Sequence, residues 1–441
     1  MRQRVLFTVL LLSLLMAVAP ITGAQEDRLQ IVGSHSILTD VITNVAGDVA
    51  DVTSVMPRGA DPHSFQPTPS DLTALADADV VFINGMFFEE GLLEAIENAG
   101  DDMNIVTASS CVEIIAFGSE GHDHGDDHDH EGDDHDHEGD DHDHEGDEHD
   151  HEDHSSEMGD MSAMATLCEQ HYAEMDAIHE ASHDHEEGED HDHEGEDHDH
   201  EEGEDHDHEE GEDHDHEHSH GEVETLGALY AIDCGAGHSH DHEGEDHEHE
   251  EGEEHDHAHD HGSCDPHVWM EPHNAMYWTM LIRDTLIEMD PANAETYTAN
   301  ATAYLEELDA LAHDFVMPMV ETVPEENRVL ITNHDAYGYF AARFDFEVAI
   351  TIIPAGTTLA EPSAADVAAV IDLIREEGVP AIFAETTVSD DLAQQIADET
   401  GAEVHVLYSG SLSEADGPAS TYVDYIRYNV TTITEALGGG M

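Results

Sequence analysis

Three histidines follow short β-branched runs that lie far apart along the chain. His63 lies in GADPHSFQPTPSD, His267 in SCDPHVWMEPHNAMYW and His334 in LITNHDAYGYFA. Ligands of open parallel sheets bind at the carboxyl ends of strands, and imidazole is a common neutral ligand of zinc. A lone histidine near a strand end is more often an ordinary hydrogen-bonding residue, but three at equivalent strand ends predict one metal site.

Two of these histidines belong to identical Asp-Pro-His triplets. Proline fixes its own φ and restricts the residue before it to extended conformations. Asp61 and Asp265 should therefore begin stiff turns that hold His63 and His267 in place. Donors that are already ordered bind a metal more tightly, because less freedom is lost on binding.

Other histidines outside the repeats are less favoured as metal ligands. His35 ends the first strand-like run and is a further candidate donor. His273 and His313 are expected on helix surfaces and His405 in an ordinary strand, so none of these three is expected to bind metal. Three histidines and a water would also suit hydrolysis, but the sequence has no HExxH motif and no nucleophile with an obvious partner. We expect no enzyme activity.

Residues 122–261 form an acidic insert that holds 34 of the 41 histidines and no Lys or Arg. Units of His-x-His recur between Asp, Glu and Gly with few apolar residues, so nothing offsets the entropy of ordering and we expect disorder. Each unit is a weak chelator, and many together raise the local concentration of a metal. The composition of the insert fits either collection or buffering of zinc. An insert that served only as a solubilising linker would explain the carboxylates but not the histidines.

The formal net charge is −98 at pH 7, and the chain has no lysine. Such a charge argues against nucleic acid or anionic lipid as a partner, because both would be repelled. It fits either cation handling or a salty habitat.

The N-terminus predicts a secretory signal peptide over residues 1–24. Two arginines precede an apolar run, and the small residues Gly23 and Ala24 suit cleavage before Gln25. No cysteine lies near this position to accept a lipid. We expect a soluble periplasmic protein, with an uncleaved leader acting as a tether as the alternative.

Four cysteines in the exported part predict disulfides. Cys111 and Cys264 flank the insert, so a bond between them would close its base. Cys168 and Cys234 lie in two less repetitive islands of the insert. The first island has helical spacing, and we expect the two islands to pack together and their cysteines to pair. The sequence alone leaves all three connectivities open.

Strand-like and helix-like segments alternate on both sides of the insert. This alternation predicts an α/β fold of two lobes, each with a parallel sheet covered by helices. Residues 25–121 and 262–290 are assigned to the N-terminal lobe and residues 324–441 to the C-terminal lobe. Between them, residues 291–323 repeat apolar side chains at helical spacing and predict one long rigid helix. Pro318 should bend or end it.

Outside the insert, the chain resembles the extracytoplasmic metal-binding proteins of zinc and manganese ABC importers. Four segments carry this resemblance: GADPHSFQPTPSDLTALADADVVFINGMFFE, DPHVWMEPHNA, TNHDAYGYFA and LYSGSLSEADGPASTYVDYIRYNVTTI. The resemblance implies two lobes joined by one long helix, with the metal between them. It implies delivery to a membrane permease driven by a cytoplasmic ATPase. His63, His267 and His334 match the family's three imidazole positions, and a His-rich loop before the second triplet is typical of its zinc members.

The family's fourth ligand has no counterpart here. Where the family usually has LYSDSL with a ligating aspartate, this chain has LYSGSL with Gly410. Glu385, at a strand end, is the best substitute; Asp416, His35, a histidine of the insert and water are alternatives. Glu385 could equally accept a hydrogen bond from a ligand imidazole. Three histidines plus water suit zinc, whereas manganese prefers more oxygen donors.

We therefore expect a monomeric periplasmic protein that binds Zn²⁺ for an ABC importer, with Mn²⁺ less favoured. A manganese or mixed-metal importer protein is the nearest alternative. A surface zinc store or adhesin, which would have no partner permease, is the alternative from another class.

Overall fold

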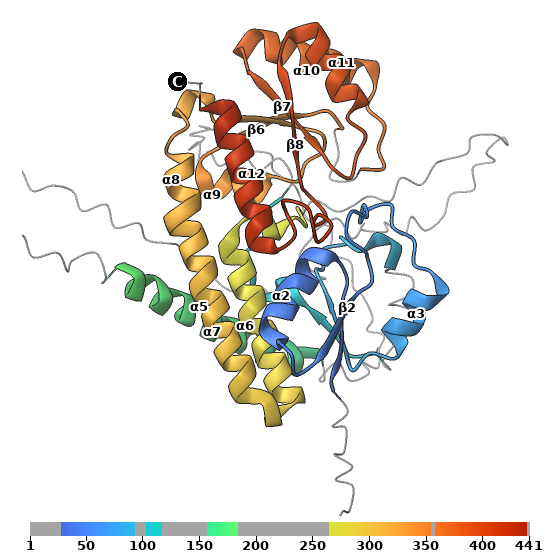
Figure 1. Cartoon of the computed structure of the whole chain (residues 1–441), viewed down its shortest axis with the longest axis vertical. Helices are drawn as coiled ribbons and strands as arrows, with labels where there is room; N and C mark the ends of the chain where they lie inside the picture. Colours follow the sequence, from blue (N-terminus) through green and yellow to red (C-terminus); the bar gives the residue numbers. More distant parts are fainter. Residues whose placement is uncertain (1–27, 93–102, 117–156, 184–263, 354–357, 439–441) are drawn as a thin grey trace, which may run out of the picture.

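The computed structural model describes residues 28–92, 103–116, 157–183, 264–353 and 358–438 (Figure 1). The expected leader, residues 1–24, and most of the insert, residues 122–261, lie outside this part. Within the described residues, no helix is both long enough and apolar enough to cross a membrane.

The first lobe is built on a parallel sheet of four strands in the order β2-β1-β3-β4. Its strands are β1 (Gln30–Gly33), β2 (Asp51–Ser54), β3 (Val80–Ile83) and β4 (Ile105–Thr107), and its helices include α2 (Ser36–Ala46) and α3 (Pro69–Ala76). All four residues of β3 are buried, as expected for a central strand covered on both faces. Thr68 caps the N-terminus of α3, and its side chain forms a capping box with Asp71.

The second lobe repeats this arrangement, with strand order β6-β5-β7-β8. Its strands are β5 (Val329–Thr332), β6 (Glu347–Thr351), β7 (Ala381–Glu385) and β8 (Glu403–Leu407). Its helices are α9 (Gly338–Phe344), α10 (Ala364–Glu377), α11 (Asp391–Thr400) and α12 (Tyr422–Leu437). The predicted fold class, two parallel sheets flanked by helices, is confirmed.

The predicted linking helix is confirmed, with one irregularity. After a short 3-10 turn, α7 (Ala294–Ala310) continues through six π-helical residues, Leu311–Val316, into α8 (Met317–Val320). Pro318 has no N–H to donate, and its ring conflicts with the carbonyl of Asp314, so the helix widens before the proline instead of ending there. Figure 1 shows α7 beside the first lobe and α8 beside α12 of the second.

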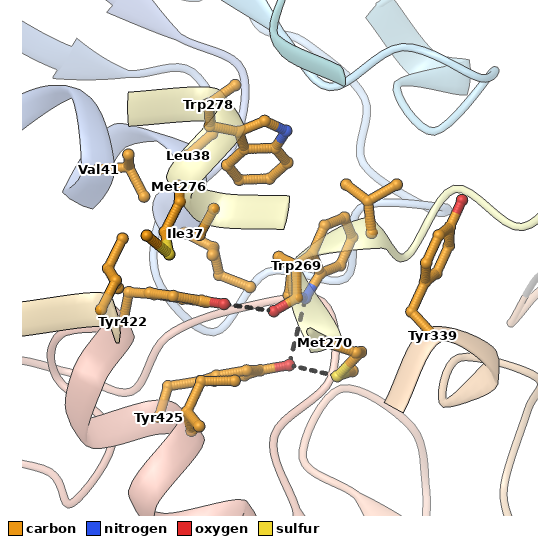
Figure 2. Packing of buried hydrophobic residues seen from close by; sticks show 14 of the residues in the cluster. Ile37, Leu38, Val41, Trp269, Met270, Met276, Trp278, Tyr339, Tyr422 and Tyr425 are labelled. Carbon is orange, nitrogen blue, oxygen red and sulfur yellow. Dashed lines mark hydrogen bonds between the residues drawn. The ribbon is translucent and has the colours of Figure 1, made fainter. Parts of the chain in front are cut away.

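Trp269 joins the two lobes near their interface (Figure 2). It lies in the 3-10 turn η5 (Val268–Met270), which precedes α6 (Pro272–Met289). Its indole N–H donates to the carbonyl of Ser409 at 3.0 Å, and its own carbonyl accepts from the Tyr422 hydroxyl at 2.7 Å. The same buried cluster contains Ile37 and Leu38 of α2 and Tyr425 of α12, so one core spans both lobes. The turn after His267 is therefore fixed by contacts with residues of both lobes.

Helix α5 (Glu157–His183) forms in the first island of the insert, as its spacing predicts. The predicted pairings of Cys111 with Cys264 and of Cys168 with Cys234 are wrong, because Cys111 is bonded to Cys168. Cys264 is also disulfide-bonded, and Cys234 lies outside the described residues.

The reason for this pairing is that α5 packs against the first lobe and the linking helix. Met175 is buried in the core there, and Arg283 of α6 pairs with Glu174 at 2.6 Å. His171 of α5 contacts Asp284 at 2.8 Å. These contacts bring Cys168 to the end of the 3-10 turn Ala108–Cys111.

Candidate metal centre

The three predicted histidines meet between the lobes. His63 follows β2, His267 precedes η5 and His334 follows β5. All three are buried, with at most 4% of their surface exposed. Their ring centroids lie 5.2 to 5.6 Å apart, and one donor atom from each lies within 4.8 Å of the others. The site is formed by residues from both lobes.

Both Asp-Pro-His triplets fold into the same local turn. The carboxylate of Asp61 accepts the backbone N–H of His63 at 3.1 Å, and the carboxylate of Asp265 accepts that of His267 at 2.9 Å. The aspartate closes a turn of fixed geometry, with proline at its centre. The triplets therefore place each imidazole through backbone geometry.

A carboxylate stands behind each imidazole ring. His267 Nδ1 lies 2.7 Å from Asp265, His334 Nδ1 lies 2.8 Å from Glu385 and His63 Nδ1 lies 3.4 Å from Glu90. An acceptor at Nδ1 holds the proton there and leaves the lone pair on Nε2. The Nε2 atoms of His267 and His334 lie 3.4 Å apart.

Glu385 lies at the end of β7, as predicted, and its carboxylate is buried. It accepts both the backbone N–H of His334 at 3.1 Å and the ring Nδ1. These contacts place it on the Nδ1 side of the imidazole, and it does not belong to the group of converging donors. The geometry favours the hydrogen-bonding role for Glu385 over that of fourth ligand.

Burial and neighbouring charges set the protonation of the site. Burial lowers the pKa of His63 and of His267, and the adjacent imidazoles lower it further. Burial also acts to lower the pKa of His334, but the charge and hydrogen bond of Glu385, together with the charges of Asp61 and Asp335, raise that pKa above its ordinary value. Burial raises the pKa of Asp265 to about 7. Two of the rings are therefore neutral at pH 7, the form that ligates a metal.

The remaining candidates for a fourth ligand lie elsewhere. His35 is packed against Phe88 and Trp269, with ring centroids 5.0 and 5.1 Å away, and burial lowers its pKa to about 3. Asp416 is exposed. Neither belongs to the converging donors.

Gly410 lies directly against the first Asp-Pro-His turn. A Cβ on this residue would be 2.8 Å from Cδ of Pro62. Real Cβ atoms do not approach other atoms so closely, so a side chain at position 410 would require Pro62 to move.

Sequence reasoning missed two features of this region. Glu90, which lies behind His63, follows a run of apolar residues. Nothing in the sequence around it predicts a contact with His63. The prediction that His273 lies on a helix surface is wrong, because α5 covers this part of α6 and leaves only 8% of His273 exposed. His313 is half-buried beside it, and His405 lies in β8 as predicted.

The family model for the periplasmic component A of the zinc-uptake complex matches residues 31–436. The manganese-binding lipoprotein MntA of Halalkalibacterium halodurans is 24% identical over 420 residues, covering 94% of this chain and 91% of that protein. The zinc-binding protein TroA of Treponema pallidum is 31% identical over 179 residues, 39% of this chain and 57% of that protein.

The comparison with solved structures gives the same fold. The periplasmic zinc-binding protein TroA from Treponema pallidum aligns with a TM-score of 0.57 at 18% identity, covering 93% of this chain and 99% of that one. A manganese-bound periplasmic metal-binding protein from Candidatus Liberibacter asiaticus aligns with a TM-score of 0.55 at 21% identity, covering 93% and 100%. The family match spans both lobes, and the chain belongs to the family of periplasmic metal-binding components of ABC importers.

Proposed function

We propose that this protein captures Zn²⁺ in the periplasm through His63, His267 and His334 and delivers it to an ABC permease. The observation that carries this proposal is the convergence of three buried imidazoles within 4.8 Å, each with a carboxylate behind it. Three imidazole nitrogens and one water complete the tetrahedral arrangement that zinc favours.

The donor set supports zinc over manganese. Manganese prefers carboxylate and other oxygen ligands. Position 410, where the family usually supplies an aspartate, is a glycine packed against Pro62. The carboxylate of Glu385 is engaged by His334 instead of joining the donors. Manganese remains the second candidate, because the similar full-length protein from H. halodurans is named as a manganese-binding lipoprotein.

The insert, residues 122–261, is assigned to zinc collection or buffering. Its His-x-His units supply many weak sites on a segment that rejoins the lobe just before His267. Weak sites in high number raise the metal concentration near the tight one. The predicted leader, residues 1–24, would export the chain as a periplasmic monomer.

Competition between the two metals tests this function. Zn²⁺ and Mn²⁺ are titrated, in competition with a chelator of known affinity, into the intact chain, a His63→Ala variant and a His405→Ala control. We expect the intact chain and the control to bind zinc tightly at the three histidines and His63→Ala to lose that zinc equivalent. Equimolar manganese should not displace the zinc. Equal retention of both metals would overturn the choice of zinc.

A variant of the insert separates its role from that of the site. His-to-Asn changes at residues 122–154 and 185–261 keep length, charge and α5. We expect the tight site to persist and the weaker zinc equivalents to disappear. Unchanged weak binding would show that the repeats do not hold zinc.

A further inference from the structure

A second group of metal-binding side chains lies where three helical elements meet outside the first site. His179 comes from α5, His273 from α6, Asp309 from α7 and His313 from the π-helical segment. One donor atom from each lies within 4.8 Å of all the others. The three imidazole ring centroids are 5.1, 5.3 and 5.4 Å apart.

His273 is oriented in the same way as the histidines of the first site. Its Nδ1 contacts the carboxylate of Glu271, which also caps α6. Its Nε2 is buried and makes no hydrogen bond within the described part of the chain. A buried polar atom without a partner is costly, and a metal ion is one of the few groups that would satisfy it here.

His313 is fixed by the helix that carries it. Its Nδ1 lies 3.1 Å from the carbonyl oxygen of Asp309 and 3.1 Å from the carboxylate of the same residue. A carbonyl can only accept, so Nδ1 is the donor and the lone pair of the neutral ring is on Nε2. His313 belongs to the π-helical stretch ahead of Pro318, and Asp309 lies in the last turn of α7 just before it. π-helical turns often occur at functional sites.

Ordinary hydrogen bonding does not account for this group. Three imidazoles surround one carboxylate, and Asp309 contacts both His313, at 3.1 Å, and His179, at 3.9 Å. Arg343 lies 3.9 Å from Glu271, whose negative charge offsets part of that of the guanidinium. The remaining charge of Arg343 still acts to lower the pKa of His179.

We propose that His179, His273, Asp309 and His313 form a second site for a zinc-like divalent cation. Three imidazole nitrogens and one carboxylate oxygen are a four-ligand set typical of zinc, and calcium or magnesium would require oxygen donors throughout. Unlike the first site, this one is completed by protein ligands.

The positions of the four ligands in the chain indicate what a bound ion would do. α5 lies between the two histidine-rich tracts of the insert and is bonded to the first lobe through Cys168. His179 is three helical turns further on, about 16 Å along the helix. An ion there would fasten the far end of α5 to the linking helix. The helix between the two histidine-rich tracts would then be held beside α6, which begins shortly after His267.

Zinc-dependent hydrogen exchange of the intact chain, resolved by peptide, tests this site. The variants are His313→Ala, His313→Gln and Asp309→Asn, with His63→Ala and His405→Ala as controls. We expect zinc to slow exchange in the second half of α5 at least about tenfold in the intact chain and in both controls. All three cluster variants should lose this protection, although their insert is unchanged.

Retained metal gives an independent measure. After dialysis against a competing chelator, the intact chain should keep about two zinc ions and His313→Gln about one. Zinc still bound in His313→Gln at the first site would show that the variant is folded. Equal zinc protection of α5 in His313→Gln and the intact chain, or no zinc effect in the intact chain, would overturn the proposal. Neither result depends on delivery of zinc to a permease.

Discussion

The Nε2 atoms of His267 and His334 lie 3.4 Å apart, although the two histidines are 67 positions apart in the chain. Each ring is held from behind by a carboxylate at Nδ1, so in the neutral state both facing nitrogens carry lone pairs. Two lone pairs at this distance repel each other, and a proton or a metal ion between them replaces this repulsion with attraction. The closeness of these atoms adds to the convergence of the three buried imidazoles, which carries the proposal of a metal at this site.

The carboxylate behind His334 should affect metal affinity without touching the metal. In Glu385→Gln the neutral amide no longer holds the Nδ1 proton as strongly, and we expect zinc affinity to fall about 10–100-fold. Glu403→Gln, whose side chain is 82% exposed, is the matched control. Chelator competition measures both. Unchanged affinity in Glu385→Gln would mean that this carboxylate does not orient the ligand.

Zinc binding should release a proton from His334. Burial alone would lower the pKa of this ring, but Glu385, together with the charges of Asp61 and Asp335, raises it above the ordinary value. Burial lowers the pKa of His63 and of His267. As pH falls through the pKa of His334, the proton competes with the metal, so affinity should fall with decreasing pH and level off above that pKa.

Calorimetric titration with zinc in buffers of different ionisation enthalpy measures this proton. The released fraction at neutral pH should decrease in Glu385→Gln, because the charge that raises the pKa is gone. The same release from Glu385→Gln and the intact chain would argue against His334 as the source.

Gly410 should discriminate between the two metals. Gly410→Ala adds a Cβ that meets Pro62 at 2.8 Å, which displaces the turn that carries His63 and should weaken zinc binding. Gly410→Asp adds the same Cβ together with a carboxylate, an oxygen ligand that favours manganese. We expect the ratio of manganese to zinc affinity to be higher in Gly410→Asp than in Gly410→Ala. An equal ratio would mean that a carboxylate at position 410 cannot reach the ion.

The disulfide between Cys111 and Cys168 should stabilise the fold without contributing to the metal centre. In the double variant Cys111→Ser with Cys168→Ser, we expect the free energy of unfolding to fall by about 2–4 kcal/mol. Urea unfolding without metal measures this loss. Zinc affinity at the first site should change little, because its ligands come from other segments. A large loss of that affinity would show that docking of α5 supports the site.

The sequence was sufficient to predict the two parallel sheets and the convergence of the three histidines. The strands are β-branched runs with clear ends, and the Asp-Pro-His triplets form their turns through local backbone geometry. The residues around Cys168 also predicted a helix correctly.

The disulfide partner and the burial that were missed depend on how α5 packs against the rest of the protein. Nothing in the sequence around Cys168 or His273 shows that α5 packs on the first lobe. The disulfide partner and the burial of His273 both follow from that packing. Glu90 likewise reaches His63 only through the tertiary fold, because the two residues are 27 positions apart in the chain.

The location of the bound ion tests the central claim most directly. Crystals of the intact chain grown with zinc, and measured on both sides of the zinc absorption edge, would locate it by anomalous scattering. The account predicts a peak about 2.0–2.1 Å from Nε2 of each of His63, His267 and His334. A zinc-loaded crystal with no peak within bonding distance of these three nitrogens would contradict it.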